Sequence, residues 1–128
     1  MKKILKIFIT LIIIIAVIIA GVMISLTQGL EEGKNIEIKG INMTNIEDGT
    51  YKGRYEFGRW SNELEVTVKE NKITDIKVLN DVKYASPDVS DKLFGEVIEA
   101  QNSKVDTVSG ATVTSKAYLK SIENALIK

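Results

Sequence analysis

The sequence predicts an α+β fold, in which helices pack on a small antiparallel sheet, preceded by one N-terminal transmembrane helix. Three observations lead to this fold class. A long uncharged apolar run opens the chain, strand-like alternation of apolar and polar residues fills residues 47–80, and two amphipathic helical patterns follow up to residue 126. Strands that come first and helices that come later favour helices packed on an antiparallel sheet.

The apolar run extends from Ile7 to Leu26, which is 20 residues without a charge. At about 1.5 Å per residue it forms a helix roughly 30 Å long, the thickness of the hydrocarbon core of a bilayer. Lys2, Lys3 and Lys6 precede it and favour a cytoplasmic N-terminus by the positive-inside rule. We therefore expect residues 1–26 to be a basic cytoplasmic tip and a single-pass signal anchor in the cell membrane, with the rest of the chain extracytoplasmic.

A cleaved signal peptide is the alternative to a permanent anchor. A signal peptide has a shorter apolar core and a cleavage site in which two small residues stand two positions apart. Here the residue two positions before Ala20 is Ile18, and no better pair follows. The uncleaved anchor is therefore favoured, and the absence of cysteine excludes a lipoprotein anchor.

The composition removes several kinds of chemistry. The chain has no cysteine and no histidine, which excludes disulfides, a Ser-His-Asp triad and the usual ligands of zinc, haem and iron–sulfur clusters. All 17 acidic residues lie beyond residue 26, so the outer part of the chain is weakly acidic. Binding to nucleic acid needs a basic surface, and we therefore predict no nucleic acid partner. Any demanding chemistry would require a borrowed cofactor, or carboxylates, hydroxyls and lysines.

The outer part divides into a tether and a folded domain. Residues 27–46 are rich in Gly, Asn, Glu and Lys, which is typical of a tether, with a short extended piece at Ile36–Ile38. Residues 47–128 then form the domain, about 80 residues, which is small but long enough to build a hydrophobic core.

Residues 48–80 have the pattern of a three-stranded β-meander. Apolar side chains alternate with polar ones, as expected when one face of a sheet lies on a core and the other faces water. A polar turn, Lys69–Lys72, separates the second strand from the third. The apolar positions are Tyr51, Tyr55 and Phe57 in the first strand, Leu64, Val66 and Val68 in the second, and Ile73, Ile76 and Val78 in the third.

Two helices are predicted after the strands. The first begins near Pro87, which suits a helix start, with Ser86 or Asp88 as its cap. Its apolar stripe is Leu93, Phe94, Val97 and Ile98. The last helix is predicted from about Ser115 to Leu126, with Tyr118, Ile122, Ala125 and Leu126 on its apolar face.

A run of small and hydroxyl-bearing residues, "SGATVTS", stands directly before the last helix. The simpler interpretation is a loop whose Thr114 or Ser115 caps the helix. The functional interpretation is a phosphate site, because a helix N-terminus offers free N–H groups and Gly110 permits close approach to the backbone. The candidate hydroxyl donors are Ser109, Thr112, Thr114 and Ser115. The spacing of a P-loop is absent.

The stretch "DTVSGATVTS", residues 106–115, is similar to the flavinylation motif of FMN-binding domain proteins, Asp-x-x-Ser-Gly-Ala-Thr. That family includes FMN-carrying subunits of the sodium-pumping NADH:quinone reductase and Rnf complexes. "DGTYKG" and "EVTVKENKITDIKVL" also resemble it, so the resemblance covers about residues 47–127. It implies that a flavin transferase attaches FMN by a phosphoester to Thr112. Asp106, Ser109, Gly110 and Ala111 match the rest of the motif.

The resemblance implies an electron carrier that works with membrane electron-transfer partners and is more a relay than a self-contained enzyme. Trp60 and Tyr84, which are near predicted loops, are candidates to stack on the flavin ring. Three alternatives stay open at this point. They are an anchored interaction module without a cofactor, a noncovalent flavin binder, and a reductase acting on a small external acceptor.

Overall fold

The computed structural model describes residues 1–127 and separates the chain into two compact units, residues 1–31 and residues 32 onward. The first unit is dominated by α1 (Lys2–Thr27), whose side chains are all exposed. The hydroxyls of Thr10 and Thr27 donate to carbonyls one turn earlier, Lys6 O and Met23 O, both at 2.8 Å. These two hydroxyls are thus satisfied within the helix, as an apolar environment requires.

Helix α1 is long and apolar enough to cross a membrane, with a mean hydropathy of 3.3 over its most apolar window. Its 26 residues span about 39 Å. A signal sequence near an N-terminus can have a similar length and composition, so these properties fit both a permanent anchor and a cleaved signal peptide.

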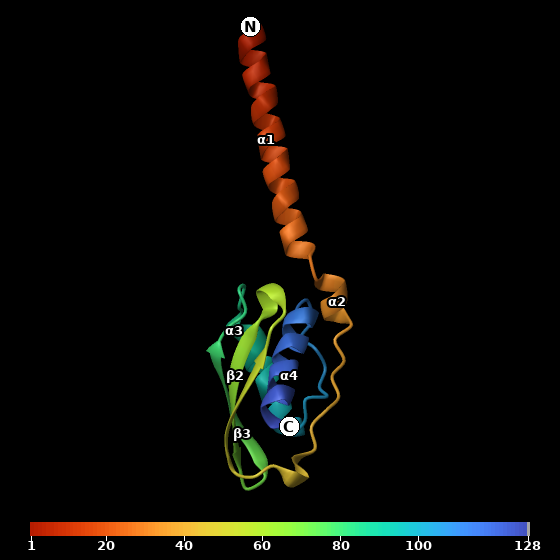
Figure 1. The fold of residues 1–128 in the computed structure, drawn as a ribbon, viewed down its shortest axis with the longest axis vertical. Coiled ribbons are helices and arrows are strands. Elements are labelled where there is room, and N and C mark those ends of the chain that lie inside the picture. The colour runs from red at the N-terminus through yellow and green to blue at the C-terminus, as the bar shows by residue number, and fades with distance from the viewer. Residues whose placement is uncertain (128) are drawn as a thin grey trace. The chain divides into compact units, whose positions relative to one another are not determined.

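The second unit contains the predicted antiparallel meander (Figure 1). Its strands are β1 (Gly49–Tyr55), β2 (Asn62–Lys69) and β3 (Lys72–Asn80), in the spatial order β1-β2-β3. Glu70 and Asn71 form the predicted polar turn, both with positive φ (51° and 63°), as a two-residue type I′ hairpin requires. Phe57 lies beyond the end of β1, whereas the other apolar positions predicted for the meander lie on its strands.

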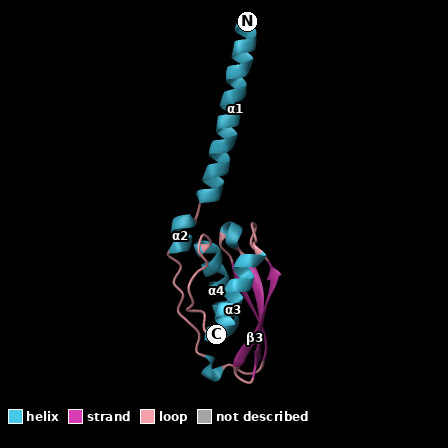
Figure 2. Ribbon diagram, turned by 180° about the vertical axis from the view of Figure 1, so that it is seen from behind, coloured by secondary structure: helices cyan, strands magenta, loops and turns pink. Residues whose placement is uncertain are grey.

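Two long helices, α3 (Pro87–Ala100) and α4 (Thr112–Leu126), pack with the sheet to form the α+β fold that the sequence predicts (Figures 1 and 2). The inward side chains of β2 and β3 and the buried faces of both helices make the core. Its most enclosed apolar members are Leu64, Val66, Val68, Ile73, Leu93, Val97, Ala117, Leu119 and Ile122. Helix α3 begins at the predicted Pro87, but the Ser86 side chain makes no capping bond.

Gly53 sets how closely α4 lies on β1. A Cβ at this position would stand 1.9 Å from Ser121 O and 2.5 Å from Ala125 N. Only a residue without a side chain therefore permits the helix backbone to lie against the strand. The contact also fixes direction, because Asn124 Nδ2 donates to Arg54 O and Ser121 Oγ donates to Asn62 O. Helix α4 thus runs antiparallel to β1, with its C-terminal end beside the start of that strand.

The segment before β1 runs beside α4 in Figure 1 and is fastened to it by side chains. We call residues 33–46 the strap. Lys116 donates to Lys34 O, and Lys120 Nζ donates to Glu37 O at 3.3 Å. The buried Glu123 carboxylate accepts from Gly40 N at 2.8 Å and from Ser103 Oγ at 2.9 Å. Most of the segment predicted as a tether is therefore held against the domain. Within it are part of α2 (Leu30–Lys34) and the 3₁₀ turn η1 (Met43–Asn45).

Candidate functional site

The small-residue run lies where a loop meets the start of α4. The loop follows α3, crosses the domain and delivers residues 106–111 to the N-terminal end of α4 (Figure 1). The 3₁₀ turn η2 (Gly58–Trp60) and the segment after β3 lie at this same end, because Glu63 pairs with Asn80 and α4 runs antiparallel to β1. The motif, η2 and residues 81–84 therefore share one end of the domain.

A tight turn shapes the loop just before the helix. Ala111 N donates to Val108 O at 2.9 Å, and Gly110 has a φ of 79°. Positive φ at the third residue is the requirement of a type II turn, which glycine meets without strain. A Cβ on Gly110 would meet nothing within 4 Å, so the space beside it is open. The structure thus gives Gly110 a conformational role and leaves room for an approaching group.

Ser115 braces this turn from inside the domain. Its side chain is fully buried, and its hydroxyl accepts from Val108 N at 3.0 Å and donates to Ala111 O at 2.7 Å. The prediction that Thr114 or Ser115 caps a helix starting near residue 115 is wrong. The helix begins three residues earlier, at Thr112, with Ala111 as an N-cap that makes no side-chain bond. The turn at Val108–Ala111 and the buried Ser115 hydroxyl therefore fix the start of the helix, which was expected to depend on a side-chain cap.

Thr112 is consequently the first residue of α4. It is partly exposed, and its hydroxyl makes no hydrogen bond within the described chain. The backbone N–H groups of Thr112, Val113 and Thr114 have no acceptor among residues 1–127. Such N–H groups, with the positive end of the helix dipole, form an anion site at a helix N-terminus. A partly exposed hydroxyl and three backbone donors without an acceptor therefore occupy one turn.

The remaining motif residues surround this turn at the surface. Asp106 and Ser109 are exposed, and Ala111 and Thr114 are partly exposed. The side chains of Asp106, Ser109 and Thr114 make no hydrogen bond or ion pair to any other described residue. Six of the seven predicted site residues are thus accessible together, and Ser115 is the one enclosed behind them.

The strap contacts the same turn from the inner side. Val113, the residue after Thr112, is buried, and its methyl groups would lie 2.3 and 2.9 Å from a Cβ on Gly33. Gly33 is therefore a second position where glycine permits close packing on α4. Sequence reasoning placed Gly33 in a tether, and nothing in the local pattern indicated this contact.

The two aromatic residues predicted to stack on a flavin ring have different surroundings. Trp60 is 5% exposed. The centroid of the Trp60 ring lies 5.6 Å from that of Phe57 and 4.2 Å from the Arg59 guanidinium. Tyr84 is 59% exposed, and the same guanidinium lies 5.6 Å from its centroid. Tyr84 therefore offers an accessible ring surface, whereas Trp60 is a largely covered neighbour.

Tyr118 and Asp81 make a contact at this end that sequence reasoning missed. The buried Tyr118 hydroxyl donates to Asp81 Oδ1, and the Tyr118 ring meets Phe94 edge-on with centroids 5.4 Å apart. Burial, with the hydrogen bond to Asp81 and the negative charge of that carboxylate, raises the pKa of Tyr118 far above its usual value. The pair fastens the segment after β3 to α4.

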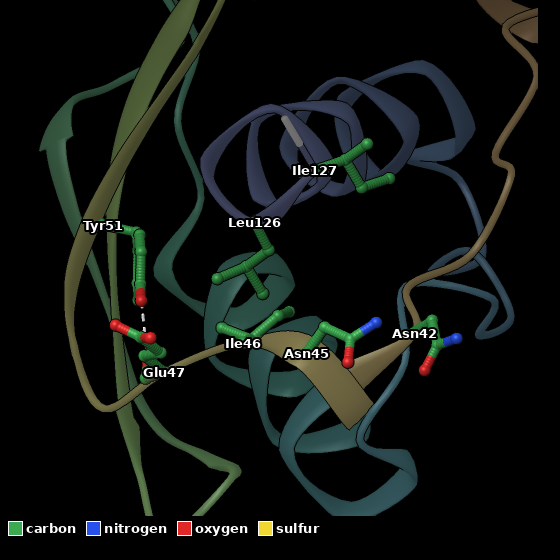
Figure 3. A pocket seen from close by; sticks show the side chains of 7 residues that line it. All are labelled: Asn42, Asn45, Ile46, Glu47, Tyr51, Leu126 and Ile127. Atoms are coloured by element: carbon green, nitrogen blue, oxygen red, sulfur yellow. Dashed lines mark hydrogen bonds between the residues drawn. The ribbon is translucent and has the colours of Figure 1, made fainter.

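A pocket of about 460 Å³ lies at the opposite end of the domain (Figure 3). Its lining residues come from the strap, the residue after it, β1 and the C-terminal end of α4: Asn42, Asn45, Ile46, Glu47, Tyr51, Leu126 and Ile127. The 15 residues of α4 separate it from Thr112 by about 20 Å. This pocket is therefore not part of the site built by the motif.

These features define a small α+β domain that presents a threonine hydroxyl at a helix N-terminus whose first N–H groups have no acceptor among residues 1–127. A model of the FMN-binding domain family matches residues 58–127, more than half of the chain, and the protein belongs to that family. The matched region holds β2, β3, α3, α4 and the motif, while the "DGTYKG" stretch precedes it. No match was found among curated proteins.

Family membership supports FMN as the cofactor and favours the flavin-binding interpretations over an anchored module without a cofactor. Together with the long apolar helix α1, it fits a membrane-anchored flavin binder. No group of three or more residues able to hold a metal ion occurs in the described part of the chain.

Proposed function

We propose that this protein is an extracytoplasmic electron carrier, anchored by α1, whose FMN is bound through a phosphoester to Thr112. The observation that carries the proposal is the first turn of α4. There, a partly exposed hydroxyl stands beside three backbone N–H groups that have no acceptor within residues 1–127.

The donors at this turn suit an FMN phosphate. A phosphate esterified on both sides keeps one negative charge, which the N-terminal end of α4 stabilises by about 0.3–1 kcal/mol when exposed. The N–H groups of Thr112, Val113 and Thr114 are available as donors, and the hydroxyl of Ser109 adds one more. We propose that these groups orient the phosphate, while Ser115 holds the turn in shape from below.

A separate flavin transferase is proposed to make the bond. The Thr112 hydroxyl has no base bonded to it in the described structure, so it is not activated by its own domain. In the transfer, Thr112 Oγ1 bonds to the FMN-side phosphorus of FAD, the pyrophosphate bond breaks, AMP leaves and the hydroxyl proton is released to the transferase or water. The domain's part is to present the hydroxyl.

Two features of the loop favour access by such an enzyme. The space beside Gly110 is open, and the N-cap Ala111 has too small a side chain to cover the turn.

Asp106 is exposed, and its carboxylate would repel a phosphate. We therefore propose that the transferase reads Asp106 and Ser109, and that Asp106 does not hold the phosphate in the finished protein.

The bound FMN would supply the redox chemistry, while the protein fixes its position and surroundings. Anchoring through α1, with its three N-terminal lysines on the cytoplasmic side, would keep the domain beside membrane electron-transfer partners. The proposed role is therefore a relay between such partners.

The test is an intact-mass measurement on the full chain co-expressed with a flavin transferase. The wild type should gain the mass of one FMN and fluoresce in a denaturing gel. Thr112→Val keeps the side-chain shape without the hydroxyl and should lose both signals. Thr114→Val is the matched control, because its residue type is the same and its hydroxyl makes no bond in the described structure. It should still be flavinylated.

Each other outcome points to a different conclusion. Flavin that is lost on denaturation of the wild type would identify a noncovalent binder. A fluorescent band that persists in Thr112→Val and disappears in Thr114→Val would identify Thr114, and not Thr112, as the FMN acceptor. A wild type that never gains the mass of FMN would overturn the proposal.

A further inference from the structure

A layered cluster of rings and cations lies at the same end of the domain as Thr112. The Arg59 guanidinium is 4.2 Å from the centroid of Trp60 and 5.6 Å from that of Tyr84. Lys83 Nζ is 5.8 Å from the Tyr84 centroid, and Phe57 stacks on Trp60. One guanidinium is therefore held near two aromatic rings, one covered and one exposed.

The backbone connects the two parts of this cluster. Lys83 N donates to Arg59 O at 2.9 Å, which ties the segment after β3 to η2. Asp81, two residues before Lys83, accepts from Tyr118 of α4. Tyr118 lies six residues, or about 9 Å along the helix, from Thr112. In Figure 1, the yellow-green coil of η2 and the start of α4 lie at the same end of the domain, and Figure 2 agrees.

The exposed side of this cluster suits a flat, electron-poor ring system. Tyr84 is 59% exposed, although its ring has two cations near it. Aromatic rings stack favourably in offset arrangements, and a guanidinium can stack on such rings as well. Trp60, which is 5% exposed, serves as the inner support of Arg59.

We propose that Tyr84 and Arg59 form the seat of the isoalloxazine ring, with Lys83 beside it, when FMN is attached at Thr112. This inference rests on the proposed function and adds the residues that contact the ring. The seat lies apart from the phosphate turn, as the ribityl chain between phosphate and ring requires. Arg59 and Lys83 are then the residues that set the charge around the ring.

The two cations have a predictable effect on redox behaviour. Addition of two electrons from a membrane partner and one proton from water leaves one negative charge on the ring. Arg59 and Lys83 stabilise that charge by Coulomb attraction, so they favour the reduced state. Replacing either cation with a neutral residue should shift the ratio of oxidised to reduced flavin about tenfold at a fixed potential. For a two-electron couple, this is about 30 mV in the negative direction.

The experiment uses the full flavinylated chain in detergent micelles, with flavin loading checked by mass. Tyr84→Leu should raise the flavin emission of the native protein severalfold toward that of the denatured protein, because contact with a tyrosine ring quenches flavin fluorescence. The matched control is Tyr51→Leu, since Tyr51 lines the pocket at the far end of the domain. Its emission should equal that of the wild type.

Potentials are measured in parallel by equilibration with dithionite and redox dyes. Arg59→Gln and Lys83→Gln should both shift the potential in the negative direction. Lys72→Gln is the control, because the exposed Lys72 begins β3 at the opposite end of the sheet. Lys83→Gln keeps the test decisive if Arg59→Gln disturbs the packing on Trp60, since Lys83 is exposed.

Unchanged native emission in a fully flavinylated Tyr84→Leu protein would overturn the proposed seat. A shift of potential in Lys72→Gln as large as that in Lys83→Gln would overturn the role of the cations, because it would show a general effect of surface charge. A wild type without the mass of FMN would instead overturn the proposed function, and the inference with it.

Discussion

Gly53→Ala is the substitution whose effect the structure determines most directly. The added Cβ would stand 1.9 Å from Ser121 O, 2.5 Å from Ala125 N and 2.8 Å from Ala125 Cβ. Real Cβ atoms essentially never approach closer than 3.0 Å, so the strand and α4 must separate locally by about 1.1 Å. Two of the three obstacles are backbone atoms, and no rotamer change relieves the clash. Movement of α4 would also loosen its contacts with the inward face of β2.

The cost is expected near the upper end of the range for overpacked cores, about 3 kcal/mol. Replacing glycine in a strand by alanine returns about 0.5–1 kcal/mol, because the unfolded chain loses freedom. The net loss is therefore about 2–2.5 kcal/mol. For a domain of this size, 1 kcal/mol shifts Tm by about 4–8 °C, so Tm should fall by roughly 8–20 °C.

Urea unfolding followed by circular dichroism, on the full chain in micelles, measures this loss. Gly95→Ala is the matched control, because Gly95 is exposed in the middle of α3 and a Cβ there meets nothing within 4 Å. It should stabilise the domain by about 0.5–1 kcal/mol through helix propensity. A Gly53→Ala protein within 0.5 kcal/mol of the wild type would refute the packing argument.

Three further predictions follow from the site and its supports. Gly110→Asn should keep flavinylation, because asparagine tolerates positive φ, whereas Gly110→Val should reduce it; equal incorporation in mass spectra would exclude a role for the turn. The stabilisation that Tyr118 gains from its raised pKa is present below about pH 10 and is lost as pH rises through the higher folded value. Tyr118→Phe removes the bond to Asp81, so the free energy of unfolding should fall less steeply as pH rises in the alkaline range. The same pH dependence in the variant and the wild type would contradict this. Glu123→Ala should cost about 1–3 kcal/mol more than Glu123→Gln, because the amide oxygen of glutamine still accepts from Gly40 N of the strap and from Ser103; equal urea midpoints would argue against these contacts.

Local patterns in the sequence predicted most of the fold. Leu64, Val66 and Val68 alternate with polar residues, and that period of two places them on the core face whatever packs there. The apolar run of α1 is equally independent of context, since its length and lack of charge are properties of composition. Pro87 correctly indicated the start of α3 because proline fits the first helical turn and not the interior.

The start of α4 was not predictable in the same way. Thr112 and Val113 have modest helix propensity, and Thr114 and Ser115 are common capping residues, so the local preference placed the cap later. In the structure, Ser115 is drawn into the core and bonds to the turn around Gly110. Burial in the tertiary structure therefore made Ser115 a brace of the turn and not a helix cap, and it placed Thr112 at the start of α4.

The sequence by itself determined the three strands, the two long helices of the domain, the long apolar helix and the motif by which the chain resembles the FMN-binding domain family, because each depends on residues close together in the chain. Only the tertiary structure decided which hydroxyls are accessible, since this depends on what α4 packs against. It likewise brought Arg59 beside Tyr84 and joined Gly40 to Glu123, contacts across 25 and 83 positions of the chain. Such contacts form when the sheet and the helices pack around a shared core, and no local periodicity in the sequence predicts them.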